Sequence, residues 1–545
     1  MSLADLLGAV DSKPGRVETA RGTVILLCSE LAGDGLDLGE LKSALGDRLP
    51  HAEVVVLRHL CERPAAAAPA LRAAGAARAV IGVCRRRVPE AELRGRIRSG
   101  GSSSCDVDIV RVPRTRGVAP AASALAAAAA RLSLLPAGEP FRAVPTPGGL
   151  SRAALLRLAP AVSLLPVAAV DAERCIGLAR CGLCAEACPA QAITSCGDTA
   201  TVVGSVCETC GRCVPACPVG AVHLAGATRA QLEAQLAALL AEPSPAGVLF
   251  ACAHAVESLD AEPALDEWAV VELPALAVAT PGWVLQTLAG GAPRVHLQPC
   301  AGECCSPWRE GGTSLELCRA LLPAALARRV TAGGHAPAAH VLAGKPPAGA
   351  PGLELAEPQA TALALRSLGA DDLVVRHPAA SFGWVDVASG CTACSACATA
   401  CPTGALEIED REDTITLLHD PSLCTGCGLC ASACPEQVVH VTRGLDLRRL
   451  DARLELASTR RRRCRACGTL LPPKAVVERN RSLLAGTWPI LAGVPDDLCL
   501  FCARTGDTIA LDRRAAGARR EEKLRWETQG PTSSTDSQST SASHR

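Results

Sequence analysis

Cysteines in one repeated spacing dominate this sequence. Of its 545 residues 30 are cysteines, and sixteen of these fall in four copies of a pattern in which three cysteines precede a Cys-Pro pair. The copies begin at Cys175, Cys207, Cys391 and Cys424. Three thiolates in one tight loop can surround a corner of an inorganic iron–sulfur cube, and the fourth thiolate then comes from elsewhere. The pattern therefore predicts four [4Fe–4S] clusters.

The cysteine before each proline predicts how the clusters are tied together in pairs. In a two-cluster ferredoxin this cysteine ligates the neighbouring cluster, so each half of a module supplies one ligand to the other half. Structural zinc is the alternative, but a zinc site uses two knuckles and has no need of a Cys-Pro run repeated four times. The expected ligand sets are Cys175, Cys181, Cys184 and Cys217; Cys207, Cys210, Cys213 and Cys188; Cys391, Cys394, Cys397 and Cys434; and Cys424, Cys427, Cys430 and Cys401.

One copy departs from the common spacing. Five residues separate Cys175 from Cys181, whereas two residues separate the first two cysteines of the other copies. The longer loop predicts that the first cluster is the most labile one, or the one whose potential is shifted. Cys196 lies between the two copies of the first module, in a stretch typical of a hairpin, and we interpret it as a free thiol.

A second cysteine pattern lies near the end of the sequence. Cys464, Cys467, Cys499 and Cys502 form two CxxC pairs. This pattern is typical of a four-cysteine metal site, and both zinc in a structural ribbon and a rubredoxin-like iron remain open because the ligands are the same. The surrounding segment 443–481 is rich in arginine. It has no interleaved aromatic residues, which favours an exposed basic face or an acidic redox partner over nucleic acid.

The remaining sequence must supply the elements that position these cysteines. Short apolar runs rich in β-branched residues lie at 22–27, 53–57, 78–83 and 107–112, separated by helix-like stretches, and the same alternation returns within 247–330. Such alternation predicts parallel sheets. We therefore predict a multi-domain fold with two α/β parallel-sheet domains, two α+β ferredoxin-like 2[4Fe–4S] modules and a C-terminal four-cysteine ribbon.

Motif positions and shifts of composition give the expected domain boundaries. The Pro/Gly/Ala-rich stretches read as linkers, and the Ser/Thr-rich end is expected to be disordered. The segments are an α/β domain at 20–135, a linker at 136–166, the first ferredoxin module at 167–226, the second α/β domain at 244–330, a connector at 331–372, the second module at 375–445, the ribbon at 458–510 and the tail at 513–545.

Several segments resemble known iron–sulfur proteins. The runs CIGLARCGLCAEACP and CTGCGLCASACP resemble those of bacterial 2[4Fe–4S] ferredoxins. Residues 20–115 resemble the N-terminal segment of the heterodisulfide reductase A subunit family, which also has a flavin domain. The resemblance lies in the runs VILLCSE, LRHLCERP and AVIGVCRRR. Within 247–330, VLFACAH and VHLQPCAGECC resemble the iron–sulfur (delta) subunit of methyl-viologen-reducing hydrogenase, which carries a [2Fe–2S] cluster and passes electrons to heterodisulfide reductase. The resemblance implies an intracellular electron-relay assembly.

Departures from these relatives leave part of the chemistry open. The second α/β domain lacks the first CxxC and the middle cysteine of the hydrogenase subunit, so it is either a [2Fe–2S] domain with altered ligands or a degenerate docking domain. No GxGxxG motif follows a strand, so no flavin or NAD site is expected. The candidate [2Fe–2S] ligands are Cys252, Cys300 and Cys304 or Cys305, with His254 as a substitute. The cysteines without an assigned role are Cys28, Cys61, Cys84, Cys105, Cys196 and Cys318, of which the first three fall at or near strand ends.

The composition of the chain indicates where in the cell this chemistry is expected. The chain is 49% hydrophobic with zero formal net charge. Its longest apolar stretches, 119–136 and 153–170, are broken by arginine or proline, so no membrane insertion is expected. The N-terminal residues carry no secretory signal pattern, and cysteines used for metal rather than disulfides favour the reducing cytoplasm.

These observations predict an electron-transfer protein rather than an enzyme. Clusters without a flavin, an open metal site or an activated nucleophile can carry electrons but do not transform a substrate. The expected partners are a dehydrogenase, a hydrogenase or a flavoprotein. Two alternatives remain: a catalytic or accessory subunit of a heterodisulfide-reductase-like complex, and an iron–sulfur redox sensor that contacts nucleic acid.

Overall fold

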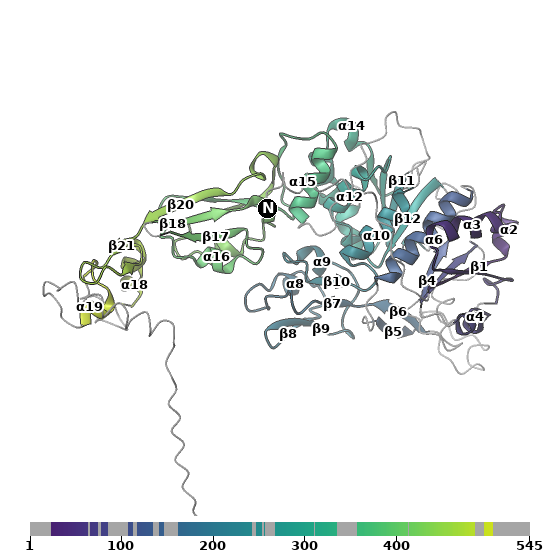
Figure 1. Ribbon diagram of the computed structural model, residues 1–545, viewed down its shortest axis with the longest axis horizontal. Coiled ribbons are helices and arrows are strands. Elements are labelled where there is room, and N and C mark those ends of the chain that lie inside the picture. Colours follow the sequence, from purple (N-terminus) through teal and green to yellow (C-terminus); the bar gives the residue numbers. More distant parts are fainter. Residues whose placement is uncertain are drawn as a thin grey trace, which may run out of the picture.

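A computed structural model shows a multi-domain α/β protein with parallel sheets (Figure 1). The sheets of the two α/β domains lie side by side, and the second ferredoxin module extends away from them toward the C-terminal ribbon. The residues that the structure describes are 23–63, 66–74, 78–84, 107–112, 117–134, 141–145, 162–241, 247–252, 255–256, 267–309, 311–334, 357–411, 414–484 and 495–504.

The first α/β domain contains a four-stranded parallel sheet in the order β2-β1-β3-β4. Its strands fall where the apolar runs predicted them, and every residue of β1 is buried. Asp37 accepts hydrogen bonds from the backbone N–H groups of Gly39 and Glu40 and so caps the helix α3. The elements are β1 (Thr23–Cys28), α2 (Glu30–Gly33), α3 (Leu38–Arg48), β2 (Glu53–Leu57), α4 (Ala67–Ala73), β3 (Arg78–Val83), β4 (Val107–Arg111) and α6 (Val118–Ser133).

The second α/β domain repeats this arrangement. Its parallel sheet has the order β12-β11-β13-β14, the same order as in the first domain when strands are counted along the chain. In both domains the first strand ends in a cysteine, Cys28 or Cys252, and a second cysteine follows the third strand. The elements are β11 (Gly247–Cys252), β12 (Trp268–Leu273), η3 (Leu276–Val278), α12 (Pro281–Ala289), β13 (Val295–Gln298), η4 (Glu303–Trp308), α13 (Thr313–Leu321), α14 (Ala324–Ala327) and β14 (Val330–Ala332).

The two α/β domains pack directly on each other. Helix α6 of the first lies against α10 (Arg229–Leu240), which precedes the second sheet. Arg131 of α6 binds Asp108 of β4 in its own domain and also donates a hydrogen bond of 3.2 Å to the carbonyl oxygen of Glu272 in β12. One continuous apolar core joins the second α/β domain to the first ferredoxin module.

Each ferredoxin module is built from short paired strands and single-turn helices. In the first, β7 (Ala168–Val170) pairs with β10 (Val222–Leu224), and the predicted hairpin consists of β8 (Ile193–Cys196) and β9 (Thr199–Val202). In the second, β16 pairs with β19 and the hairpin β17-β18 gains a third strand, β20. The elements of the two modules are completed by α8 (Leu183–Glu186), α9 (Cys213–Ala216), β15 (Val374–Arg376), β16 (Gly383–Val387), α16 (Ala396–Ala400), β17 (Leu406–Asp410), β18 (Thr414–His419), η5 (Pro421–Leu423), α17 (Leu429–Ser432), β19 (Val439–Asp446), η6 (Leu447–Arg449) and β20 (Leu454–Arg460).

Two predicted connecting segments contain regular structure instead. Within the linker 136–166, β5 (Phe141–Pro145) and β6 (Val162–Pro166) pair as antiparallel strands. Within the connector 331–372, α15 (Glu357–Ser367) packs against α12 because it buries alanine and leucine side chains on one face. The abundance of proline, glycine and alanine around both elements concealed them. The tail 513–545 lies outside the described residues.

The C-terminal ribbon is small and has its own core of three buried cysteines and two leucines. It contains β21 (Arg462–Arg463), β22 (Leu470–Leu471), α18 (Lys474–Leu484) and α19 (Leu500–Arg504). Throughout the described residues, every helix is too short or too polar to cross a membrane.

Candidate iron–sulfur and metal centres

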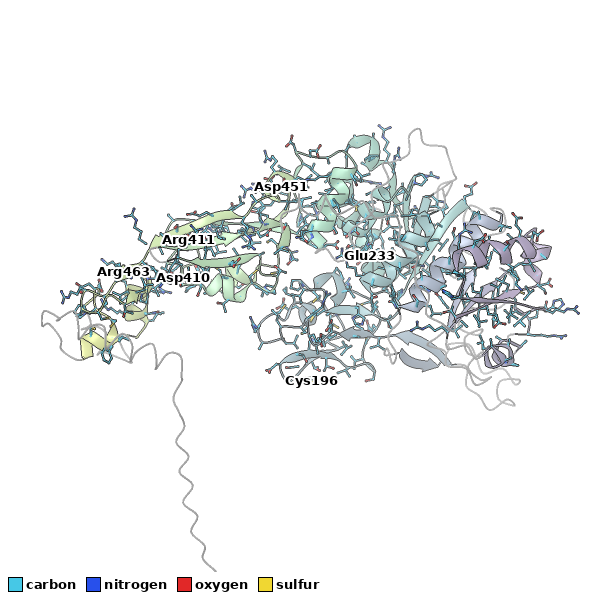
Figure 2. The ribbon with its side chains drawn as sticks, viewed as in Figure 1. Cys196, Glu233, Asp410, Arg411, Asp451 and Arg463 are labelled. Atoms are coloured by element: carbon cyan, nitrogen blue, oxygen red, sulfur yellow. The ribbon has the colours of Figure 1, made fainter. Side chains whose placement is uncertain are left out.

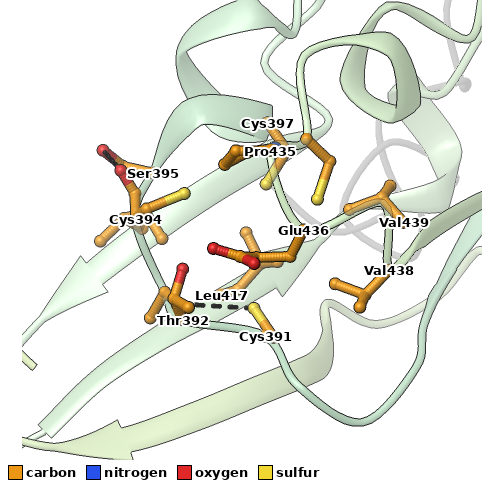
Figure 3. A pocket seen from close by; sticks show the side chains of 13 residues that line it. Cys391, Thr392, Cys394, Ser395, Cys397, Leu417, Pro435, Glu436, Val438 and Val439 are labelled. Carbon is orange, nitrogen blue, oxygen red and sulfur yellow. Dashed lines mark hydrogen bonds between the residues drawn. The ribbon is translucent and has the colours of Figure 1, made fainter. Parts of the chain in front are cut away.

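Three cavities in the ferredoxin modules are each lined by four cysteines. One is lined by Cys391, Cys394, Cys397 and Cys434 and is shown in Figure 3. The other two have the same kind of lining, and the three empty volumes are similar, at about 320, 300 and 350 Å³. In all three, the fourth cysteine is the one that precedes proline in the opposite half of the module. The linings of the other two are Cys401, Cys424, Cys427 and Cys430, and Cys188, Cys207, Cys210 and Cys213.

The remaining four ferredoxin cysteines also gather, around Cys184. Burial, together with the neighbouring thiols of Cys217, Cys181 and Cys175, raises the pKa of the Cys184 thiol to about 11. Each of these three thiols therefore lies near Cys184. The structure therefore brings together each of the four groups that the spacing predicted.

The backbone of all four cysteine loops has the same unusual conformation. The second residue after the first cysteine has positive φ in every copy, including Thr209 (φ 59°) and Ala393 (φ 53°), where no glycine eases the strain. The residue after the second cysteine has positive φ as well, and in one copy it is Ser395 (φ 66°). Alternation of right- and left-handed residues turns successive N–H groups inward and makes an anion-binding concavity of the kind found at iron–sulfur sites.

Backbone N–H groups of these loops point at cysteine sulfur atoms. The N–H group of Gly177 lies 3.4 Å from the sulfur of Cys175, and that of Ala221 lies 3.2 Å from the sulfur of Cys217. Such donors stabilise thiolates and shift cluster potentials. The residues present therefore fit a polyanionic cluster with four thiolate ligands.

The longer first loop makes a contact that the sequence did not predict. Arg180, one of the inserted residues, donates a hydrogen bond of 3.3 Å to the carbonyl oxygen of Thr399 in α16 of the second module. The thiol of Cys427 is near enough to raise the pKa of Cys181, although burial of Cys181 is the larger cause. The insertion thus lies between the two modules. Cys196, by contrast, is exposed on the outer hairpin of the first module (Figure 2).

Three other cysteine groups are more compact. Within each, all sulfur atoms lie within 4.8 Å of one another, and no disulfide joins any of the described cysteines. The ribbon group is the predicted one: the sulfur atoms of Cys467 and Cys499 are 3.7 Å apart. Although burial of the Cys467 thiol opposes the change, hydrogen bonding with the side chain and backbone of Thr469 lowers its pKa to about 6 and so favours the thiolate that a metal requires. The groups are Cys252, Cys300, Cys304 and Cys305; Cys464, Cys467, Cys499 and Cys502; and Cys28, Cys61 and Cys84.

The two compact groups in the α/β domains were incompletely predicted. The sequence predicted that either Cys304 or Cys305 is a ligand in the second domain, whereas the sulfur atoms of both belong to the group. His254 lies outside the described residues. In the first domain the sulfur atoms of Cys61 and Cys84 are 3.2 Å apart, and a hydrogen bond from Cys61 lowers the pKa of Cys28 to about 5. The position of both groups at strand ends of a parallel sheet was the available signal.

Comparison with protein families agrees with the ferredoxin geometry. Residues 390–438 match the 4Fe-4S dicluster domain family, 167–193 match a 4Fe-4S binding domain, and 183–228 match the LdpA Fe-S cluster-binding domain. The chain contains 4Fe-4S ferredoxin-type domains. These matches span about a fifth of the chain. No curated protein matches it, so the resemblance of the α/β domains to heterodisulfide reductase and hydrogenase subunits remains an interpretation of the sequence.

Proposed function

We propose that this chain relays single electrons through four [4Fe–4S] clusters between a redox donor and an acceptor protein. The observation that carries the proposal is the contact between the two modules, where Arg180 binds the backbone of Thr399. Two isolated ferredoxin modules would serve as separate carriers, whereas modules in contact form one connected path. The clusters would supply one-electron redox chemistry, and the cysteines and loop N–H groups would hold them in place.

Contacts between domains indicate the order of the centres. Arg212, beside Cys213, donates a hydrogen bond of 3.2 Å to the hydroxyl of Ser306, next to the compact group of the second α/β domain. Arg180 links the other half of this module to α16 of the second module. Arg479 of α18 donates a hydrogen bond of 3.2 Å to the carbonyl oxygen of Pro435, next to Cys434. The path would therefore run from the second α/β domain through both modules toward the ribbon.

The proposed partners follow from the two ends of this path. A dehydrogenase, hydrogenase or flavoprotein would meet the chain at one end and an acceptor at the other. In the ribbon we propose one zinc ion, with iron as the alternative, held by four thiolates. We place the relay in the cytoplasm, because cysteines that serve as metal ligands rather than in disulfides are typical of reducing compartments.

The decisive experiment is anaerobic purification of the full chain with metal and sulfide analysis. Four clusters predict about 16 iron atoms and about 16 acid-labile sulfides per chain, and reduction with dithionite should give EPR spectra of magnetically interacting clusters. Zinc without reducible iron, or tight and salt-sensitive DNA binding by a chain without reducible iron, would overturn the proposal.

A matched pair of variants tests the contact between modules. Arg180→Ala removes the bond to Thr399 and should weaken the magnetic interaction between clusters without changing the iron content. Arg174→Ala is the control, because Arg174 pairs with Asp171 inside the first module. Unchanged interaction in Arg180→Ala would refute a path through this contact.

A further inference from the structure

The compact group of the second α/β domain has the dimensions of a single-ion site. The sulfur of Cys305 lies 3.4 Å from that of Cys252 and 3.5 Å from those of Cys300 and Cys304. The sulfur atoms of Cys300 and Cys304 are 3.7 Å apart. All four sulfur atoms lie within 4.8 Å of one another.

These distances distinguish between metal centres of different size. A metal–sulfur bond of about 2.3 Å implies a sulfur–sulfur edge of about 3.8 Å when four thiolates surround one ion tetrahedrally. A [2Fe–2S] core separates its two pairs of thiolates by the length of the core, so sulfur atoms on different irons cannot be as close as those on one iron. In this group no pair is set apart from the others in that way.

The other cysteine groups of the chain allow the spacing of these sulfur atoms to be compared. The ribbon group, whose CxxC pairs are typical of a one-ion site, falls within the same 4.8 Å limit. Among the described residues, the ferredoxin cysteines are absent from the groups within this limit, and three of their four sets line cavities instead. The structure thus separates wide sites from compact ones, and the second α/β domain has a compact site.

The fold places this group where parallel sheets hold ligands. Cys252 ends β11 and Cys300 follows β13, the two adjacent strands between which the chain direction of the crossovers reverses. Ligands of open α/β sheets bind at this point, beyond the carboxyl ends of the strands. Cys304 and Cys305 reach the same point from η4.

The loop that carries three of the ligands is held in place. The Arg309 guanidinium donates hydrogen bonds to the carbonyl oxygens of Ala301 and Gly302, the latter at 2.7 Å. The N–H group of Gly302 in turn lies 3.2 Å from the sulfur of Cys300. Cys252 and Cys305 are fully buried, so water has little access to the centre of the group.

From this geometry we propose that Cys252, Cys300, Cys304 and Cys305 bind one divalent thiophilic ion, zinc or iron, and not a [2Fe–2S] cluster. Four thiolates are a donor set for either ion. The four [4Fe–4S] clusters use other cysteines, so electron transfer among them does not require this ion. If the ion is iron, the site adds a fifth redox centre beside the cluster near Cys213; if it is zinc, the site is structural.

The test compares two variants of the full chain, purified without oxygen. Cys305→Ala removes a proposed ligand, and Cys318→Ala is the control, since Cys318 is buried in the same domain but lies outside the group. Relative to the control, Cys305→Ala should lose one atom of zinc or iron per chain. Acid-labile sulfide and the EPR signal of the reduced [4Fe–4S] clusters should remain unchanged.

Each other outcome overturns the proposal. Loss of two irons together with two sulfides would indicate a [2Fe–2S] cluster, and equal metal content in both variants would mean that the group binds no ion. If Cys305→Ala does not fold, the unmodified chain provides a second measurement. Zinc-edge X-ray absorption and Mössbauer spectroscopy, combined with metal analysis, should then show two single ions of zinc or iron in total per chain, counting the ribbon ion, each with four sulfur neighbours and no metal neighbour. One such ion alone would refute the site.

Discussion

The ion pair between Arg131 and Asp108 should be the main electrostatic link of the first α/β domain. The guanidinium of Arg131 lies 2.5 Å from both carboxylate oxygens of Asp108, whose side chain is 5% exposed. Breaking a buried pair by removing one partner costs about 3–5 kcal/mol. We expect Arg131→Ala to lower the free energy of unfolding by about 3 kcal/mol, the lower end of that range, because the Arg131 side chain is 18% exposed.

Native-state hydrogen exchange is the appropriate assay, because a multi-domain chain has no single unfolding free energy. A loss of about 3 kcal/mol corresponds to roughly 100-fold faster exchange of the slowest amides in β4 and α6. Protection should fall less in β12, where only the bond from Arg131 to the carbonyl oxygen of Glu272 is lost, worth about 1 kcal/mol.

A double-mutant cycle with Asp108→Asn provides the control. In that background the charge attraction is already gone, so Arg131→Ala should cost at least about 1.5 kcal/mol less than in the unmodified chain. Equal effects in both backgrounds, or a loss below about 1 kcal/mol in the single variant, would refute the role assigned to the pair.

Three further predictions concern other parts of the chain. His419 is fully buried, accepts a hydrogen bond from the N–H group of Val385, and has its pKa lowered by burial. As pH falls below about 6.5, His419 therefore takes up a proton in the unfolded chain before it does so in the folded one, and the second module should lose stability. In His419→Gln the stability of this module, measured by hydrogen exchange between about pH 5 and 7, should depend less on pH. Gly247→Ala should cost about 2–3 kcal/mol in protection of β11, since Gly247 has φ +132° and a Cβ atom would clash with the carbonyl oxygen of Arg294; unaltered exchange would contradict this. Cys467→Ala should release one ion from the ribbon while acid-labile sulfide stays constant, as metal and sulfide analysis of the purified chain would show.

Most of the candidate sites could be predicted from local sequence patterns. The cross-tied grouping of cysteines such as Cys188 with Cys207 follows from chemistry that one motif contains, and the apolar runs located the strands of both parallel sheets. The additional ligand in the second α/β domain was harder to predict, because the local backbone conformation decides whether two adjacent cysteines face the same centre. The short helical segment η4 turns both Cys304 and Cys305 toward it.

Contacts between segments far apart in the chain could not be predicted from the sequence. Arg180 and Thr399 are separated by more than two hundred residues, and nothing in either segment specifies the other. The same holds for β20, which extends the hairpin of the second module although its sequence adjoins the ribbon. Pairing of this kind depends on how whole domains pack, and the local pattern of apolar residues does not indicate which distant segments will meet.

The matching strand orders of the two α/β sheets bear on how this protein arose. Each sheet is followed along the chain by a ferredoxin module, so the sequence reads as two successive copies of one two-domain unit, with the ribbon added at the end. A duplication of that kind doubles the number of cluster loops in a single event. The inserted residues around Arg180 occur in only one of the four loops, so this one loop differs from its three counterparts in a segment that contacts the other module.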